Sequence, residues 1–379
     1  MSLLEILAKS VRQSLTRMPS SVVFNHPARD EIVEEVVHWL RRAAASSHEG
    51  GVAARFDLRK NVWQSAYPET SGYLIATLVN LGVLQKNPSL LEFAEQIAEY
   101  LRSNQSADGA IDCARADLVT DAGLRKPLHV AFDLGAMLSG LCAVSEVNSD
   151  FVKSTAALAS FLLSKQSLDG DWKGLKYFPE LGSHNSLVGS SLLKAGRLLD
   201  DQRYIDGAVR TLEYLRPRIR SDGFITGCGF GDSDMKRTFI HPFCYAIEGF
   251  QDANRLVPGL DYPIEASLDR LVEMCDGRNL PPSHFDENFK RKSWYSAMTG
   301  IAQASTVLLR SDKQLHRVAG ENLFDRLLSG IDVKSRTGGV RGGVQSSWPF
   351  HGSYGRFTYN NWGARYLLDA YLQLPDTIG

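Results

Sequence analysis

Side chains that could transfer protons or bind a polar ligand fall at six similar points in the chain, each beside the start of an apolar stretch. They are Glu69, Thr70, Tyr73, His129, Asp133, His184, Asn185, His241, Tyr245, Trp294, Tyr295, Asn360, Asn361 and Trp362. Three of the nine histidines are among them. One histidine at a helix start is readily explained as a structural cap. Because imidazole titrates near neutral pH, its recurrence indicates acid–base chemistry instead.

Proton removal beside a carboxylate is one chemistry that these residue types allow, as in epimerisation of a uronic acid or β-elimination from it. It needs a base, a proton donor and a group that neutralises the enolate-like charge. The candidates for proton transfer are His241, His184, Tyr295 and His129. Asn185 or Arg356 would neutralise the charge.

Glycoside hydrolysis is the second chemistry, and it needs two carboxyl groups that flank the bond to be broken. Glu69 and Asp133 form the best pair of acids, because both lie at equivalent points of the pattern. Sequence spacing does not give the separation of the two groups, so both chemistries stay open.

Aromatic and amide side chains near the same points are suited to holding a sugar, because a ring combines apolar area with a polar edge. The predicted substrate-binding residues are Tyr73, Asn185, Tyr245, Trp294, Trp348, Tyr354, Arg356, Asn361 and Trp362. Each aromatic residue taken singly is also explained by core packing.

The apolar stretches that these residues introduce alternate with more strongly amphipathic ones. The former begin at Tyr67, Leu128, Ser183, Ile240, Ser293 and Tyr359, and the latter at Glu31, Leu90, Phe151, Tyr204, Ile264 and Ala319. The pattern repeats about every 50 to 65 residues, which predicts one helical hairpin per repeat. We therefore predict an all-α (α/α)6 toroid of six hairpins, with the small-residue helices inside and the amphipathic ones outside.

The loops and the ends of the chain complete this expected architecture. Residues 1–27 are expected to form an N-terminal helix and residues 28–379 a single toroid domain. Small β-hairpins are expected in the longer loops, at 223–230 and 338–344. Asp-Gly pairs after three outer helices predict tight structural turns, because glycine tolerates a positive φ.

Composition limits the classes of partner and the setting. The formal net charge is -1, so no broad basic surface is available for nucleic acid. Five widely spaced cysteines suit reduced thiols in the cytoplasm. The first 20 residues lack the apolar core of a secretion signal, and no apolar run is long enough to span a membrane.

Short motifs add resemblances to known families. Residues 161–172, FLLSKQSLDGDW, resemble the repeat of terpene cyclase and prenyltransferase toroids and of helical-toroid enzymes that act on glycans. The six junctions together look like those of a cytoplasmic toroid family associated with bacterial surface-polysaccharide biosynthesis. Residues 294–298, WYSAM, with Gln303, are similar to a stretch of glucuronyl epimerases. These resemblances imply a saccharide ligand, free or linked to a lipid or nucleotide, and a partner in a polysaccharide assembly complex.

Three other interpretations follow from particular residues. Cys228, His241 and Cys244 are ligand types that zinc accepts, but the Cys-His-Gly motif of the toroidal lanthionine cyclases is absent, so we expect no cofactor. Terpenoid cyclisation would use Asp232 and Asp234, which loosely resemble the protonating motif of class II cyclases. A third alternative is a non-catalytic protein that binds a glycan in an assembly complex.

Overall fold

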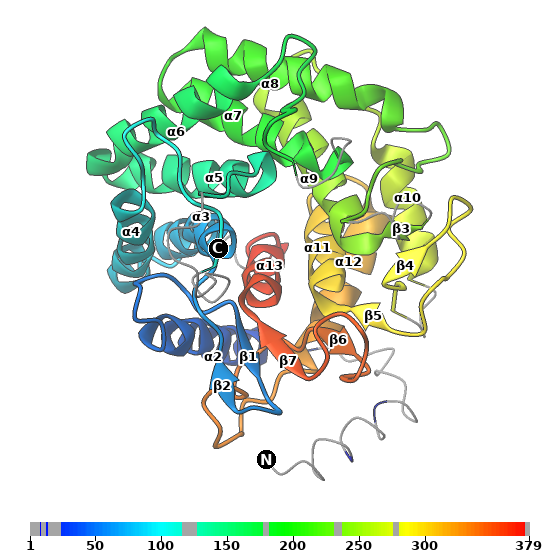
Figure 1. The fold of residues 1–379 in the computed structure, drawn as a ribbon. Helices are drawn as coiled ribbons and strands as arrows, with labels where there is room; N and C mark the ends of the chain where they lie inside the picture. Colours follow the sequence, from blue (N-terminus) through cyan, green and yellow to red (C-terminus); the bar gives the residue numbers. More distant parts are fainter. Residues whose placement is uncertain are drawn as a thin grey trace.

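Two concentric rings of helices make up the fold (Figure 1). The structure is a computed structural model that describes residues 8, 13, 24–115, 127–176, 182–230, 237–275 and 280–375. The outer ring contains α2 (His26–Ala45), α4 (Pro88–Ser103), α6 (Val152–Lys165), α8 (Gln202–Leu215), α10 (Glu265–Met274) and α12 (Gln314–Leu328). The inner ring contains α3 (Pro68–Leu84), α5 (Ala131–Val147), α7 (Ser186–Leu198), α9 (Ile240–Leu256), α11 (Met298–Leu309) and α13 (Asn361–Tyr371).

Contacts between neighbouring inner helices close the inner ring. Each inner helix packs against the next one in the sequence, and the last, α13, packs against the first, α3. The outer helices cover this ring, for example α4 on α3 and α12 on α11. The predicted (α/α)6 toroid of six hairpins is therefore confirmed.

Small residues allow the inner helices to approach closely. A Cβ at Gly140 in α5 would lie 2.0 Å from the carbonyl oxygen of Gly72 in α3. A Cβ at Gly249 in α9 would lie 2.3 Å from the hydroxyl of Ser186 in α7. Real side chains cannot occupy such positions, so glycine sets the diameter of the ring at these points.

Short strands brace the starts of the later inner helices. β1 (Arg55–Asp57) lies between β2 (Val62–Trp63) and β7 (Thr358–Asn360), while β3 (Thr238–Phe239) pairs with β4 (His284–Phe285) and β5 (Ser296–Ala297) with β6 (Ser347–Trp348). All of these pairings are antiparallel. β3, β5 and β7 each run directly into an inner helix, so the pairings fix the direction in which α9, α11 and α13 enter the ring.

The two predicted hairpin positions are wrong. Residues 223–230 contribute one isolated bridge, between Ile219 and Ile225, and residues 338–344 form turns. The glycines of the second segment serve close packing instead. A Cβ at Gly339 would lie 2.3 Å from the ring of Phe56, and one at Gly342 would lie 2.2 Å from the carbonyl oxygen of Glu35.

The Asp-Gly turns after the outer helices are structural, as predicted. Gly109, Gly170 and Gly223 have φ of 91°, 92° and 89°, and each lies against the backbone of the next outer helix. A Cβ at Gly170 would lie 2.5 Å from the carbonyl oxygen of Arg210 in α8. The turns therefore join one hairpin to the next around the outside of the ring.

We expect Gly170→Ala to lower the free energy of unfolding by about 1–3 kcal/mol, because alanine is strained at positive φ and would collide with α8. Chemical denaturation measures this loss. Gly174→Ala is the matched control, since no heavy atom lies within 4 Å of a Cβ at that position. Equal unfolding midpoints for the two variants would contradict the structural role of the turn.

The N-terminal prediction falls mostly on residues outside the described part of the chain. Of residues 1–23, Gln13 is described in detail: its amide donates to Gln345 Oε1 at 3.1 Å and accepts from the backbone N–H of Phe350 at 2.9 Å. The domain boundaries at residues 27 and 28 stay a prediction. Among the described residues, no helix has the length and apolar character needed to cross a membrane.

Candidate functional site

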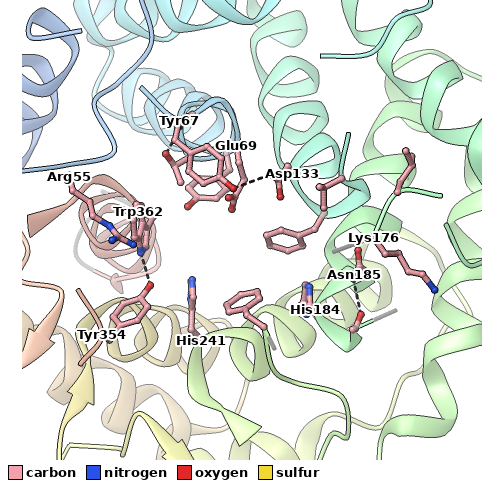
Figure 2. Close-up of a pocket in the computed structure, with 17 residues that line it drawn as sticks. Arg55, Tyr67, Glu69, Asp133, Lys176, His184, Asn185, His241, Tyr354 and Trp362 are labelled. Atoms are coloured by element: carbon pink, nitrogen blue, oxygen red, sulfur yellow. Dashed lines mark hydrogen bonds between the residues drawn. The ribbon is translucent and has the colours of Figure 1, made fainter. Parts of the chain in front are cut away.

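A cavity of about 410 Å³ lies on the ring axis at the end where the inner helices begin (Figure 2). Its volume is within the range of small-molecule sites, roughly 300–1,000 Å³. Nine of the residues singled out from the sequence line it: Glu69, Thr70, Tyr73, Asp133, His184, Asn185, His241, Tyr354 and Trp362. The wall also contains Arg55, Tyr67, Lys176 and Phe230, none of which was among the predicted site residues.

The inner-helix N-termini give this cavity a polar character. In the structure, α3, α5, α7, α9 and α11 begin without a side-chain cap, whereas Asn360 caps α13 by accepting from the N–H of Gly363. The first N–H groups of a helix have no partner within the helix, and they carry its positive dipole end. The starts of α3, α5 and α9, whose first-turn residues line the cavity, favour an anionic or hydroxyl-rich ligand there.

Two carboxyl groups from adjacent inner helices lie in the wall. Glu69 lies in the first turn of α3 and Asp133 in the first turn of α5, and they are 9% and 2% exposed. The Tyr67 hydroxyl donates to Asp133 Oδ2 at 3.0 Å. Burial, and next the negative charge of Asp133, raise the pKa of Glu69 well above its usual value, while a hydrogen bond from Tyr67 opposes the rise. Glu69 therefore holds a proton under conditions in which an exposed glutamate has lost it.

An arginine on an aromatic face lies in another part of the wall. The Arg55 guanidinium carbon is 4.6 Å from the ring centroid of Trp362, and Trp362 Nε1 donates to the Tyr354 hydroxyl at 2.7 Å. Arg55 Nε is buried without a hydrogen-bond partner, and no carboxylate of the described residues forms an ion pair with this side chain. Burial lowers the Arg55 pKa, but a guanidinium keeps its charge at any working pH. The cavity thus contains a cation with an unused donor.

Two histidines face the cavity from η3 (Ser183–Asn185) and from the first turn of α9. His241 Nδ1 is hydrogen-bonded to Gln303 Oε1, while His184 Nδ1 is buried without a partner. Burial, reinforced by the charge of His241, lowers the pKa of His184 to about 3. Burial also lowers the pKa of His241 to about 4, although the hydrogen bond that its Nδ1–H donates to Gln303 Oε1 acts in the opposite direction. Both imidazoles are therefore neutral near pH 7 and are weak bases.

The remaining predicted site residues do not line the cavity. Tyr245 packs beneath it, with its ring centroid 4.5 Å from that of His241. The Asn361 amide donates to the carbonyl groups of Val52 and Ala53, which is a structural contact. His129 packs edge-on against Phe161, with 5.3 Å between ring centroids. Trp294, Tyr295, Trp348 and Arg356 belong to β5, β6 and the segments that flank them.

An ion-pair network fills the ring axis beneath the cavity. Arg365 Nε lies 2.8 Å from Asp369 Oδ2, and Arg365 Nη2 lies 3.6 Å from Glu248 Oε1. Arg310 pairs with the same Glu248 oxygen at 3.7 Å. The Arg365 guanidinium also covers the ring of Tyr73, which lines the cavity, at 4.8 Å. Tyr73 therefore joins this network to the cavity wall.

The possible zinc ligands have other contacts. Cys228 Sγ lies 4.0 Å from the Thr226 carbonyl oxygen, and Cys244 Sγ lies 3.9 Å from that of Gly300. Over the described ranges, no three His, Cys, Asp or Glu side chains are grouped as a metal site requires. The expectation of no cofactor stays a prediction.

The chain was compared with protein families, curated proteins and solved structures. No family model matches it, and no curated protein matches it. Several solved toroids do. An unsaturated glucuronyl hydrolase from Bacillus sp. GL1 has a TM-score of 0.70 at 17% identity, covering 92% of this chain and 97% of that one.

Two further structures extend the comparison. An unsaturated glucuronyl hydrolase from Streptococcus agalactiae has a TM-score of 0.68 at 14% identity and covers 93% of both chains. An alpha-amylase from Clostridium perfringens has a TM-score of 0.65 at 11% identity, covering 91% of this chain and 97% of the other. At such low identity the likeness concerns the fold, and this chain accordingly shares the α/α-toroid fold of the unsaturated glucuronyl hydrolases.

Proposed function

We propose that the protein is a glycoside hydrolase that binds the acidic end of a saccharide in its axial cavity and cleaves the adjoining glycosidic bond. The observation that carries this proposal is the buried Glu69–Asp133 pair at the starts of two adjacent inner helices.

The two carboxyl groups have different environments and so different roles. Glu69, with its raised pKa, donates a proton to the substrate as the general acid. Asp133, held by the Tyr67 hydroxyl, serves as the carboxylate partner that accepts a proton from water. The proton lost by Glu69 is thus balanced by the one that Asp133 takes up.

Arg55 supports an acidic substrate. Its guanidinium carries a charge and a buried N–H without a partner, and it lies over the Trp362 ring. A uronic acid carboxylate would satisfy both the charge and the donor. Two of the neighbouring enzymes described above are named for glucuronyl substrates, which supports the same class of sugar for this chain.

We expect Arg55→Gln to raise KM for a uronic acid substrate by roughly 10- to 150-fold, because a charge-assisted hydrogen bond contributes about 1.5–3 kcal/mol. Initial rates over a range of substrate concentrations measure this change. Arg59→Gln is the matched control on the same hairpin, since the Arg59 side chain is largely exposed and pairs with Asp57. Equal KM values for the two variants would contradict a carboxylate-binding role.

Epimerisation and β-elimination are less well supported. Both need a base that removes a carbon-bound proton, and a histidine with a pKa of about 3 or 4 is too weakly basic for this step. Terpenoid cyclisation predicts a cavity that is apolar throughout, whereas Glu69, Asp133 and Arg55 line this one. Asp232 and Asp234, on which that alternative depends, lie outside the described residues.

The biological setting remains part of the proposal. Surface-polysaccharide biosynthesis, a lipid- or nucleotide-linked form of the saccharide and an assembly-complex partner rest on the sequence resemblance alone. A cytoplasmic location is likewise a prediction, and it agrees with the finding that all five cysteines are free thiols.

The test is incubation of the purified protein with disaccharides that carry a saturated or a 4,5-unsaturated uronic acid at the non-reducing end, alongside neutral disaccharides. We expect release of the acidic sugar. Chromatography detects it for both kinds of acidic disaccharide, and for the unsaturated ones the loss of ultraviolet absorbance detects it as well. An epimerised but uncleaved product, a new double bond, or binding without turnover would each contradict hydrolysis. The last outcome would favour the glycan-binding alternative.

A further inference from the structure

Trp294 is a large aromatic residue exposed to solvent beside β5. It lies two residues before β5, which runs into the start of α11, so it belongs to the end of the ring where the inner helices begin. Its side chain is 57% exposed. The His351 ring lies against it with 4.8 Å between centroids and 31° between planes, so one partner holds the indole in place.

A continuous series of rings connects Trp294 to the cavity. Tyr354 lines the cavity, and its ring centroid lies 5.3 Å from that of Phe239. Phe239 stacks on His284 at 4.8 Å, and His284 lies 6.5 Å from Tyr295. Tyr295 lies 5.4 Å from Trp294, which completes the series.

The backbone also connects the surroundings of Trp294 to the cavity wall. His351, which supports Trp294, and Tyr354, which lines the cavity, are three residues apart, so their Cα atoms are at most about 10 Å apart. The Arg356 guanidinium holds this segment by donating from Nε to the His351 carbonyl oxygen at 3.1 Å. The position of the exposed indole is therefore coupled to the cavity wall by one short segment.

We propose that Trp294 is a second saccharide subsite, which stacks on the part of an oligosaccharide that extends out of the cavity. The occupant is a pyranose ring of the chain whose acidic end lies beside Glu69 and Asp133. The apolar face of a sugar covers indole area that is otherwise in water. This inference rests on the proposed function, and it adds that the preferred substrate is longer than a disaccharide.

The test compares di-, tetra- and hexasaccharides that share one uronic acid at the non-reducing end. We expect the wild-type protein to have a kcat/KM that rises with chain length, mainly through a lower KM. Trp294→Ala should lower kcat/KM on the tetrasaccharide about tenfold more than on the disaccharide. Trp294→Phe should restore most of the difference, because it keeps an aromatic face. Leu315→Ala, which truncates a side chain that is 64% exposed on α12, is the control and should not change the ratio.

Calorimetric binding of the same oligosaccharides separates this inference from the proposed function. Binding that tightens with chain length and is weakened by Trp294→Ala supports the subsite, even if no bond is cleaved. The subsite would be overturned if cleavage or binding did not depend on chain length. It would also be overturned if Trp294→Ala lowered kcat/KM equally on all substrates. Either result would leave the hydrolase proposal intact. Failure to bind any of these saccharides would overturn both.

Discussion

Replacing Glu69 by glutamine is expected to lower kcat by about 10²- to 10⁴-fold, the usual contribution of a general acid. Glutamine keeps the size and hydrogen-bonding ability of the side chain but has no carboxyl proton to donate. KM should change much less than kcat, because the interaction that is lost belongs to the transition state. Steady-state kinetics on a uronic acid disaccharide measures both quantities.

The pH dependence provides a second readout of the same group. The pKa of Glu69 is raised, so its acid form persists into a higher pH range, and activity should fall as the pH rises through that pKa. The raised pKa also means that folded-state stability falls as the pH rises from about 4.5 upward, because the folded protein holds this proton more tightly than the unfolded chain.

Glu69→Gln should therefore lose activity without losing stability, and its stability relative to the wild type should increase with pH. Denaturation curves at acidic and mildly alkaline pH test this directly. A variant that stays active, or one that is inactive because it is unfolded, would contradict the assignment of Glu69 as the acid. Asp133→Asn is the companion variant, and it should also lose activity, since it removes the carboxylate partner.

Replacing Arg365 by methionine is expected to lower the free energy of unfolding by about 3–5 kcal/mol. The side chain pairs with Asp369 and Glu248 on the ring axis, and its guanidinium covers the rings of Tyr73 and Tyr366. Methionine fills a similar volume but leaves buried carboxylates without this partner. Urea denaturation followed by circular dichroism measures the loss.

Two further variants isolate the electrostatic cause. Arg341→Met removes a largely exposed arginine that pairs with Glu35 at 3.0 Å, and it should cost at most about 1 kcal/mol. Adding Asp369→Leu to Arg365→Met should recover part of the lost stability, because one of the unpaired carboxylates is then gone. Equal stability of the single Arg365 variant and the Arg341 variant would contradict a stabilising role for the axial ion pairs.

Periodicity in the sequence was enough to predict the toroid. Glycine- and alanine-rich stretches such as 131–147 alternate with more strongly charged ones such as 202–215, and this alternation predicts inner and outer helices. The residues that begin the inner helices must then meet at one end of the ring. This geometric consequence predicts that Glu69, Asp133 and His184 share one cavity, and all three line it.

The sequence contained a weaker signal for the rest of the wall. Arg55 lies on β1, outside the repeat, and reaches the cavity because β1 pairs with β7 just before α13. That pairing joins residues about 300 positions apart, so no local pattern reveals it. A charged residue flanked by the apolar Ala53, Ala54 and Phe56 was the one available clue. Tyr67 was easier to predict as a site residue, because it directly precedes Pro68 at the start of α3.

The order of helices, the closed ring and the meeting of the inner-helix starts depend on hydrophobic spacing along the chain, which is a local property and can be read residue by residue. Burial, and the distances between segments remote in sequence, decide the rest. They decide the direction in which each pKa is shifted, which arginine lacks a counter-ion and which tryptophan stays exposed to water. Burial raises the pKa of Glu69 and lowers the pKa values of His184 and His241. The carboxyl pair is therefore better suited to acid catalysis than the two imidazoles. Only the packing of the whole ring creates that burial.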